Sequence, residues 1–259
     1  MTIDIPRLLA LVGAGFLAGV MNAVAGGGTL VTFPTLVLSG LGSIAANATS
    51  TIALLPAALS SAFGYRNKIS TVSRWLRVFA PVSLAGGLIG GILLVATPSK
   101  VFDGLVPFLI FFATILFMAQ GAFKNFLGAR AGSEASRSGR WIAGAALFQF
   151  AVAIYGGYFG AGIGILMLAS LGMLGFKDVH EMNTLKVMLG FLINIVAALY
   201  FIMNGLVNWP DAGTMVIGAI AGGYAGAHVA QRLPQTLVRS AITGIGLIIS
   251  AVMFYRQFR

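Results

Sequence analysis

The sequence predicts an all-α, polytopic membrane helix bundle, and three observations lead to that fold class. Long stretches lack charge, the chain is strongly apolar, and its two halves resemble each other. Residues 8–65 contain no Asp, Glu, Lys or Arg, and the chain is 58% hydrophobic and 8% charged. A helix needs about 20 apolar residues to cross a bilayer, and each charge at its centre costs roughly 2.5–3.5 kcal/mol on insertion scales. Further charge-free runs occupy residues 78–99, 104–123, 141–176, 187–210, 212–231 and 240–255.

Composition also restricts the function classes. At a mean hydropathy of +0.96, too few charges are present to cover a water-soluble surface. The chain has no cysteine, which excludes disulfides and thiolate metal sites, and its two histidines argue against a histidine-based metal centre. We therefore expect neither a cofactor nor a metal. The N-terminal run resembles a signal peptide up to Ala25, but apolar sequence continues beyond it, so we interpret it as a retained first helix.

Basic residues gather in two connectors, and this predicts their side of the membrane. Residues 66–77 hold four basic residues and no acid, and residues 124–140 hold four against Glu134 alone. Cytoplasmic loops carry an excess of Lys and Arg, so both connectors are expected in the cytoplasm, with two spans (78–98 and 101–121) between them. Because the positive-inside rule explains the excess of Lys and Arg, the net charge of +10 does not require a nucleic-acid partner.

An internal duplication divides the chain. When Ala25 is placed on Ala161, the two halves align in one register without a gap. We therefore expect a first transmembrane repeat at 1–121, a basic cytoplasmic connector at 122–140 and a second repeat at 141–259. Such repeats are common in secondary transporters, whose substrate site lies near the bilayer midplane where the repeats meet. The further matches in this repeat register are Gly26 with Gly162, Gly28 with Gly164, Leu30 with Leu166, Asn47 with Asn183, residues 85–87 with 221–223, and Gly90 with Gly226.

Each half opens with an apolar stretch that is too long for one span. Residues 8–41 or 141–175 would form a helix of about 50 Å, against a bilayer core of about 30 Å. Glycines interrupt both stretches, at 26–28 and at 156–164, and leave short pieces (29–39 and 165–174) that cannot span. We predict eight spans plus two re-entrant half-helices. The alternative is ten crossings, in which case the halves are inverted repeats of five.

The two breaks are the leading candidates for a binding site. A half-helix that begins after a glycine turn presents free N–H groups and a positive dipole end, which suits an anion. Thr29 can cap the first half-helix or donate its hydroxyl. The alternative is that glycines only allow helices to pack closely. We favour packing for Gly86, Gly87, Gly90, Gly91, Gly222, Gly223 and Gly226, and function for Gly26, Gly27 and Gly28, which lie between Asn22 and Thr29.

A second set of polar residues follows each break. Asn47 and Thr51 are four positions apart, and so share a helical face, as do Asn183 and Lys186 at a spacing of three. Asparagine donates hydrogen bonds without a charge, whereas lysine adds a cation for an anionic ligand. Lys186 could instead extend to the interface, and Asn194 could join helices rather than contact substrate. The predicted substrate site comprises Asn22, Gly26, Gly27, Gly28, Thr29, Asn47, Thr51, Gly162, Gly164, Asn183, Lys186 and Asn194.

Titratable residues are sparse within the predicted spans. No carboxylate lies deep in one, which argues against a sodium site or a carboxylate proton relay. His228 and His180 are candidates for proton coupling, with a structural role as the alternative. An enzyme is not expected, because the chain has no nucleophile elbow, no zinc-protease motif, no cofactor fingerprint and no Walker loop.

Recognisable motifs surround both breaks: Gly19-x-x-Asn22-Ala23-x-Ala25-Gly26-Gly27-Gly28-Thr29-Leu30 with Pro34, Asn47-Ala48-Thr49, Phe159-Gly160-Ala161-Gly162-x-Gly164, Asn183-x-x-Lys186, Asn194 and Gly205-x-x-x-Trp209. They resemble the TauE/SafE family of anion transporters, within the toluene sulfonate uptake permease superfamily. The resemblance covers essentially the whole chain. It implies a multi-pass permease of the bacterial inner membrane for a small anion, because family members are described as exporters of sulfite, sulfoacetate or related organosulfur anions, and some as importers.

The favoured hypothesis is therefore a secondary transporter that exports sulfite or an organosulfonate, with the bilayer and that anion as its partners. An anion channel and a non-transporting accessory membrane subunit are the alternatives. A homo-oligomer is compatible with the sequence.

Overall fold

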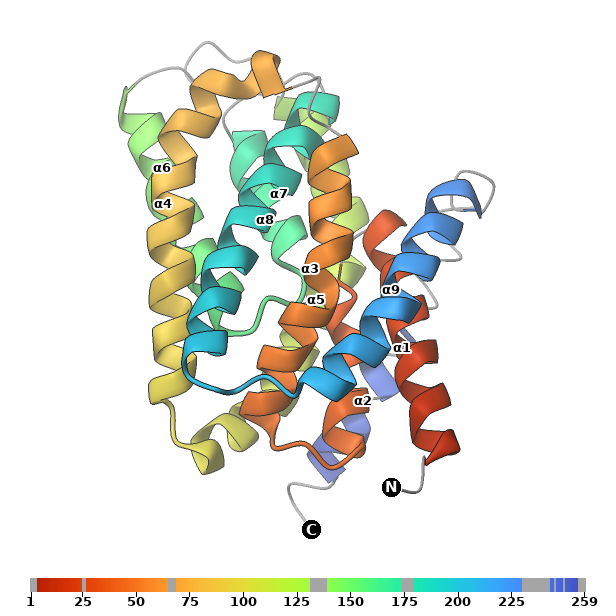
Figure 1. Cartoon of the computed structure of the whole chain (residues 1–259). Helices are drawn as coiled ribbons and strands as arrows, with labels where there is room; N and C mark the ends of the chain where they lie inside the picture. Colours follow the sequence, from red (N-terminus) through yellow and green to blue (C-terminus); the bar gives the residue numbers. More distant parts are fainter. Residues whose placement is uncertain are drawn as a thin grey trace.

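The computed structural model of the chain is a helix bundle (Figure 1). It describes residues 4–24, 27–64, 69–130, 139–173, 179–229, 243–244, 246–248 and 250–255, and these contain helices and no strand. The helices are α1 (Ile5–Val24), α2 (Thr29–Leu38), α3 (Ser43–Gly64), α4 (Ile69–Ala96), α5 (Ser99–Arg130), α6 (Gly139–Tyr158), α7 (Ile163–Met173), α8 (Val179–Met203) and α9 (Trp209–Val229).

The helices have the length and surface expected of a membrane protein. Within the described part of the chain, four stretches are long and apolar enough to cross a bilayer, namely Ile5–Asn22, Ile69–Ala96, Ser99–Leu116 and Glu181–Met203, and shorter apolar helices accompany them. Large apolar side chains face outward, among them Phe108 (53% exposed) and Ile217 (67% exposed). Because lipid rather than water favours such a surface, the prediction of an all-α membrane bundle is confirmed at this level.

Both predicted helix breaks are present. The first lies between α1 and α2, and the second between α6 and α7. At each break the chain turns back, so that α2 runs down beside α1 and α7 runs up beside α6 (Figure 1). The second short helix begins at Ile163, slightly before the predicted start at Ile165. This earlier start shows that the second break is confined to residues 159–162.

Close glycine contacts join helices that are far apart in sequence. A Cβ on Gly15 or Gly19 of α1 would overlap carbonyl oxygens of α9, and one on Gly222 of α9 would overlap the carbonyl of Phe16. The helices α4 and α6 meet in the same way, through Gly90 and the carbonyl of Ile154. Close helix packing therefore explains Gly86, Gly87, Gly90 and Gly222. A Cβ would make ordinary contacts at Gly91 and would meet open space at Gly223. The surroundings of Gly226 are not among the features that the structure describes.

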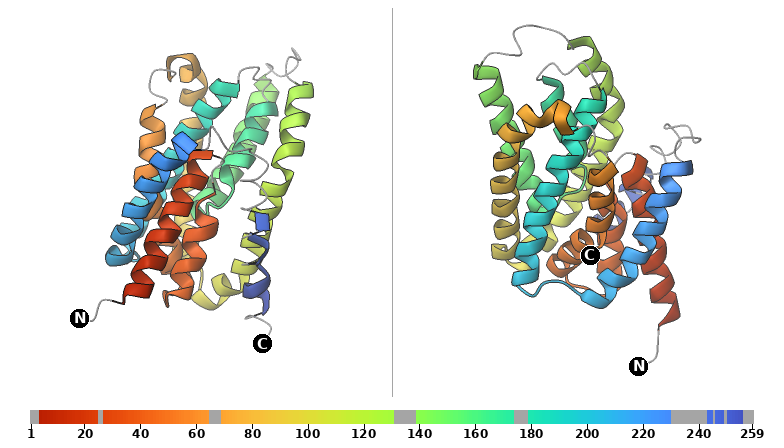
Figure 2. Two further views of the ribbon diagram at one scale, coloured as in Figure 1. Left: turned by 90° about the vertical axis from the view of Figure 1, so that its right-hand side faces the viewer. Right: turned by 45° about the horizontal axis from the view of Figure 1, so that its top comes forward.

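These contacts also fix the helix directions. Contacts advance together along α1 and α9, and likewise along α4 and α6, so each pair is parallel. The helix α8 is parallel to α4 in turn, since Gly87 lies against Ile193 and Gly91 against Ala197. The helices α1, α3 and α9 therefore run one way, and α4, α6 and α8 run the other way (Figures 1 and 2). The first helices of the two halves, α1 and α6, therefore run in opposite directions.

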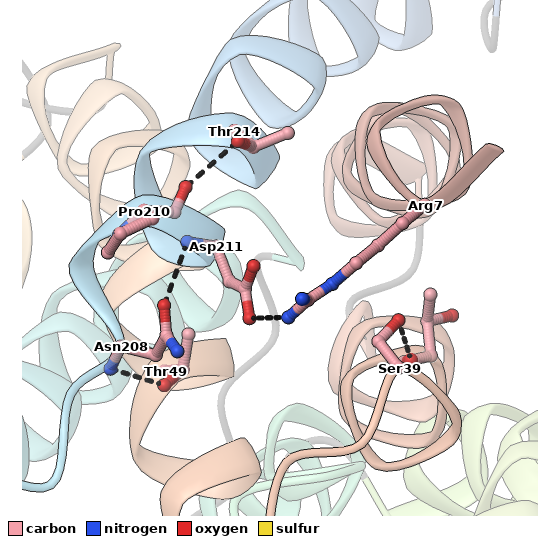
Figure 3. Close-up of polar contacts among 8 residues, drawn as sticks. Arg7, Ser39, Thr49, Asn208, Pro210, Asp211 and Thr214 are labelled. Carbon is pink, nitrogen blue, oxygen red and sulfur yellow. Dashed lines mark hydrogen bonds and ion pairs between the residues drawn. The ribbon is translucent and has the colours of Figure 1, made fainter. Parts of the chain in front are cut away.

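An ion pair fastens the end of the bundle at which α1 begins. The Arg7 Nη2 donates to Asp211 Oδ2 at 2.8 Å, and the Asp211 side chain is only 8% exposed (Figure 3). The Asn208 side chain accepts the Asp211 amide at 3.1 Å, while the Asn208 amide donates to Thr49 Oγ1 at 3.0 Å. The sequence alone does not reveal this pair, because Arg7 and Asp211 are 204 positions apart. The cluster holds the starts of α1 and α9 against α3.

Candidate functional site

A side-chain cap and a left-handed glycine form the first break. Gly27 has φ +96°, a conformation that only glycine adopts without strain. The Gly28 amide donates to Asn22 Oδ1 at 2.9 Å, so the last turn of α1 holds the chain that follows it. A Cβ on Gly28 would lie 2.8 Å from the Ala18 carbonyl oxygen, so this glycine lets the turn return closely against α1. The start of α2 is therefore fixed by α1 itself.

The second break is built from backbone conformation. Gly160 and Gly162 have φ +81° and +76°. The amides of Phe159 and Gly160 both donate to the Tyr155 carbonyl, at 2.9 and 3.2 Å, which closes the end of α6. The Tyr155 hydroxyl then donates to the Ala161 carbonyl at 2.8 Å. These contacts reverse the chain between α6 and α7 and direct α7 back along α6.

A cavity of about 160 Å³ lies where the two breaks meet. That volume holds several water-sized molecules. Its polar lining comes from the end of α1, both breaks, α3 and α8: Asn22, Gly27, Thr29, Thr51, Gly160, Gly162, Gly164, Lys186, Gly190 and Asn194. Its apolar wall comprises Leu54, Leu55, Ala57, Ala58, Phe159, Ile163, Met167, Val187 and Phe191.

Lys186 is the one charged residue among the described residues that line this cavity. It lies on α8, and its Cδ would be 3.5 Å from a Cβ on Gly164, so the aliphatic stem crosses the start of α7. Around it the lining offers amide and hydroxyl groups from Asn22, Thr29, Thr51 and Asn194. One cation with several neutral donors favours an anion of low charge. The apolar wall can accept a small hydrocarbon part.

The cavity gathers eight of the residues predicted for the substrate site, namely Asn22, Gly27, Thr29, Thr51, Gly162, Gly164, Lys186 and Asn194. Three others lie elsewhere. Gly28 packs against α1, Asn47 is buried and donates to the Tyr158 carbonyl at 3.0 Å, and Asn183 is partly buried and absent from the lining. Gly26 lies outside the described residues, as do the side chains of His180 and His228.

Sequence reasoning missed several lining residues. Gly190 carries a usable signal, because Lys186, Gly190 and Asn194 recur at every fourth position and so share one face of α8. Phe191, Leu54 and Leu55 carry none, because an apolar side chain in a membrane helix can equally face lipid, protein or a cavity. Only the packing of α3 against α8 directs them inward.

Comparison with known proteins identifies the family. The profile described as "Sulfite exporter TauE/SafE" matches residues 11–253, nearly the whole chain. The chain belongs to the TauE/SafE family. The resemblance noted from the glycine motifs is thereby confirmed, and the family is one of membrane transporters.

Curated relatives agree with this assignment. A "Probable membrane transporter protein" of Haemophilus influenzae is 28% identical over 99% of this chain and 98% of its own length. The "Probable membrane transporter protein YfcA" of Escherichia coli K12 is 25% identical over 92% of the chain and 86% of that protein. A "Probable membrane transporter protein ORF9" of Sinorhizobium is 24% identical over 92% and 88%. No solved structure matches the chain.

Proposed function

We propose that this TauE/SafE member is a secondary transporter that exports a small sulfur-containing anion, such as sulfite or an organosulfonate, across the bacterial inner membrane. The cavity between the two helix breaks carries the proposal. It combines one lysine with amide and hydroxyl donors at a point where two short helices begin. The positive ends of these helices add to the attraction for an anion. The family description supports sulfur chemistry in the substrate.

The proposed membrane orientation follows from the helix directions. The connectors after α3, α5, α7 and α9 all follow helix ends on one side of the bundle. Their sequences hold six basic residues (Arg66, Lys68, Arg137, Lys177, Arg232 and Arg239), whereas the opposite connectors at 39–42, 97–98 and 204–208 hold none. Arg7, at the opposite end, is neutralised by Asp211. The positive-inside rule therefore favours a cytoplasmic location for the basic connectors.

The proposed architecture is a pair of inverted repeats at 1–121 and 141–259, joined by the connector at 122–140. Two observations support it. In the repeat register that places Ala25 on Ala161, the helix order α1 to α4 corresponds to α6 to α9, and α1 and α6 run in opposite directions. The contacts also correspond, because α1 packs on α9 as α6 packs on α4. In this arrangement α2 and α7 return the chain to the ends at which α1 and α6 begin, which corresponds to the ten-crossing alternative with inverted halves of five.

The membrane potential supplies a driving force for export. A negative-inside potential favours exit of an anion by about 2.3 kcal/mol per charge for each 100 mV. Uptake against that potential would need a coupled ion, for which His180 and His228 are the candidate proton carriers. Export needs no such coupling, and it therefore fits a cavity in which Lys186 is the one charged residue among the described lining residues.

The test is flux in proteoliposomes that contain the purified protein. Efflux of sulfite, thiosulfate, sulfoacetate and sulfate should be compared between the native chain and Gly27→Val. Valine cannot adopt the left-handed backbone at this position without strain, so flux should fall by at least tenfold while membrane insertion persists. Gly13→Val is the matched control, because Gly13 is exposed on α1 and a Cβ there meets nothing within 4 Å.

Equal flux from native protein and Gly27→Val would refute the site. Absence of flux for the whole panel would favour the accessory-subunit alternative. Single-channel currents would identify a channel rather than a carrier.

A further inference from the structure

A cluster of rings, here called the aromatic seal and defined as Phe33, Phe102, Tyr158 and Phe159, packs next to the cavity wall. The Phe33 ring lies edge-on to Phe159 at a centroid distance of 5.4 Å and to Phe102 at 6.4 Å. Phe102 in turn meets Tyr158 at 5.6 Å. Phe33 and Phe102 are fully buried and Phe159 is 2% exposed. Phe159 also lines the cavity, so the seal lies against the cavity wall, with Phe33 packed behind Phe159.

Asn47 attaches this seal to α3. Its Nδ2 donates to the Tyr158 carbonyl at 3.0 Å. Tyr158 is the last residue of α6, and carbonyls at a helix end have no partner within their own helix. The asparagine therefore supplies a donor to the end of α6 next to the second break. The Tyr158 hydroxyl is also 3.4 Å from Thr97 Oγ1, which connects the seal to the turn between α4 and α5.

The Asn47 side chain uses its donor but not its acceptor in this arrangement. The Asn47 residue is only 1% exposed, and its Oδ1 has no hydrogen-bond partner among the described residues. A buried acceptor without a donor costs at least as much free energy as one neutral hydrogen bond contributes. The amide is therefore half satisfied in this arrangement, and a conformation that offers a donor to Oδ1 can compete with it.

The two ends of the cavity differ. From the breaks, the cavity extends along the C-terminal half of α3, through Leu54 and Ala58, and along the N-terminal half of α8, through Lys186 and Gly190. Both halves lead toward the basic connectors, and the seal lies on the opposite side. The repeat counterparts of the seal residues carry no rings, because Phe33, Phe102, Tyr158 and Phe159 correspond to Ala169, Val238, Asn22 and Ala23 in the repeat register.

We propose that the aromatic seal and Asn47 are the gate at the non-cytoplasmic end, and that the structure represents the state that admits the anion from the cytoplasm. This inference rests on the proposed transport function and orientation. Asn47 is a positioning residue, because it acts on the second break rather than on the anion. When it leaves the Tyr158 carbonyl, the end of α6 can separate from α3 and the rings can part.

The absence of cysteine from the chain allows a direct test. Ala58→Cys places a single thiol in the cavity wall, and a membrane-impermeant maleimide can be applied to right-side-out or inside-out vesicles. In the otherwise native chain, labelling should be at least tenfold faster from the cytoplasmic face. Adding Asn47→Ala should raise labelling from the other face at least tenfold, and adding Phe33→Ala should act in the same direction by removing a ring from the seal.

Asn204→Ala is the matched control. The Asn204 side chain also donates to a carbonyl of its helix end, that of Tyr200 at 2.8 Å, but it is exposed and lies away from the cavity. It should leave both labelling rates unchanged. Faster labelling of Ala58→Cys from the non-cytoplasmic face, or unchanged labelling in both the Asn47→Ala and Phe33→Ala backgrounds, would overturn the gate. Labelling needs no substrate, so this result is independent of whether sulfite is carried.

Discussion

The two helix breaks solve the same problem with different chemistry. At the first, Asn22 caps the Gly28 amide, and a 2.6 Å hydroxyl contact between Thr32 and Ser50 joins α2 to α3. At the second, Gly160 and Gly162 supply the turn. Lys186 corresponds to Ser50 in the repeat register, and it brings a positive charge to the cavity lining. The first break is thus held by the hydrogen bonds of Asn22 and Ser50, whereas α8, which packs on α7 after the second break, provides the charge in the cavity.

Of the substitutions that probe this difference, those of Lys186 should have the largest effect, which is on anion affinity. Lys186→Gln removes the one charged residue among the described lining residues while keeping a long polar side chain. Anion affinity should fall at least tenfold, which is about 1.4 kcal/mol. Lys186→Arg is the control that retains the charge. Equilibrium binding of sulfite to purified protein, measured by calorimetry, checks both, and equal affinity in the Gln variant would contradict the assigned role.

The second break should depend on glycine more sharply at 160 than at 164. Gly160→Ala forces a side chain into a left-handed conformation, at a cost of about 1–2 kcal/mol. Gly164 lies at the start of α7, where a Cβ would make an ordinary 3.5 Å contact with Lys186, so Gly164→Ala should cost less. Thermal unfolding in detergent compares the two variants. A lower midpoint for Gly164→Ala than for Gly160→Ala would show that the turn is not held by backbone conformation.

The first break should depend on the acceptor of Asn22. Asn22→Ala leaves the Gly28 amide without its partner and should destabilise the protein by about 1 kcal/mol. Asn22→Asp keeps an oxygen acceptor for that amide but adds a negative charge to the cavity lining. It should therefore retain thermal stability better than Asn22→Ala while weakening anion binding. Parallel loss of stability and affinity in both variants would argue against this separation of roles.

The smallest effect is expected at Ser50. Ser50→Ala removes the contact with Thr32, but the Thr32 hydroxyl keeps a second contact with the Gly28 carbonyl at 3.2 Å. The loss should be about 0.5–1.5 kcal/mol, the usual contribution of one hydrogen bond. A double-mutant cycle with Thr32→Val measures the coupling between the two hydroxyls. A coupling near zero would show that the contact does not hold α2 to α3.

The sequence predicted the breaks because glycine and helix length are local properties. Gly27 and the run around Gly160 interrupt apolar stretches that are too long for a single span, and both breaks occur there. Asn47 shows where local reasoning ends. Its pattern predicted a substrate contact, whereas its side chain reaches Tyr158, 111 positions away. The partner of Asn47, like the pairing of Arg7 with Asp211, depends on which helices become neighbours, and a hydropathy pattern carries little of that information.

The glycine-lined seam between α1 and α9 has a consequence for biogenesis. The helix α1 packs mainly on α9, which is translated about 200 residues later, a delay of roughly 10–40 s at ordinary elongation speeds. During that interval the small-residue face of α1, with Gly15 and Gly19, is exposed to lipid. Translation that stops before Asp211 therefore leaves α1 without its partner helix, and we expect quality-control proteases to recognise it.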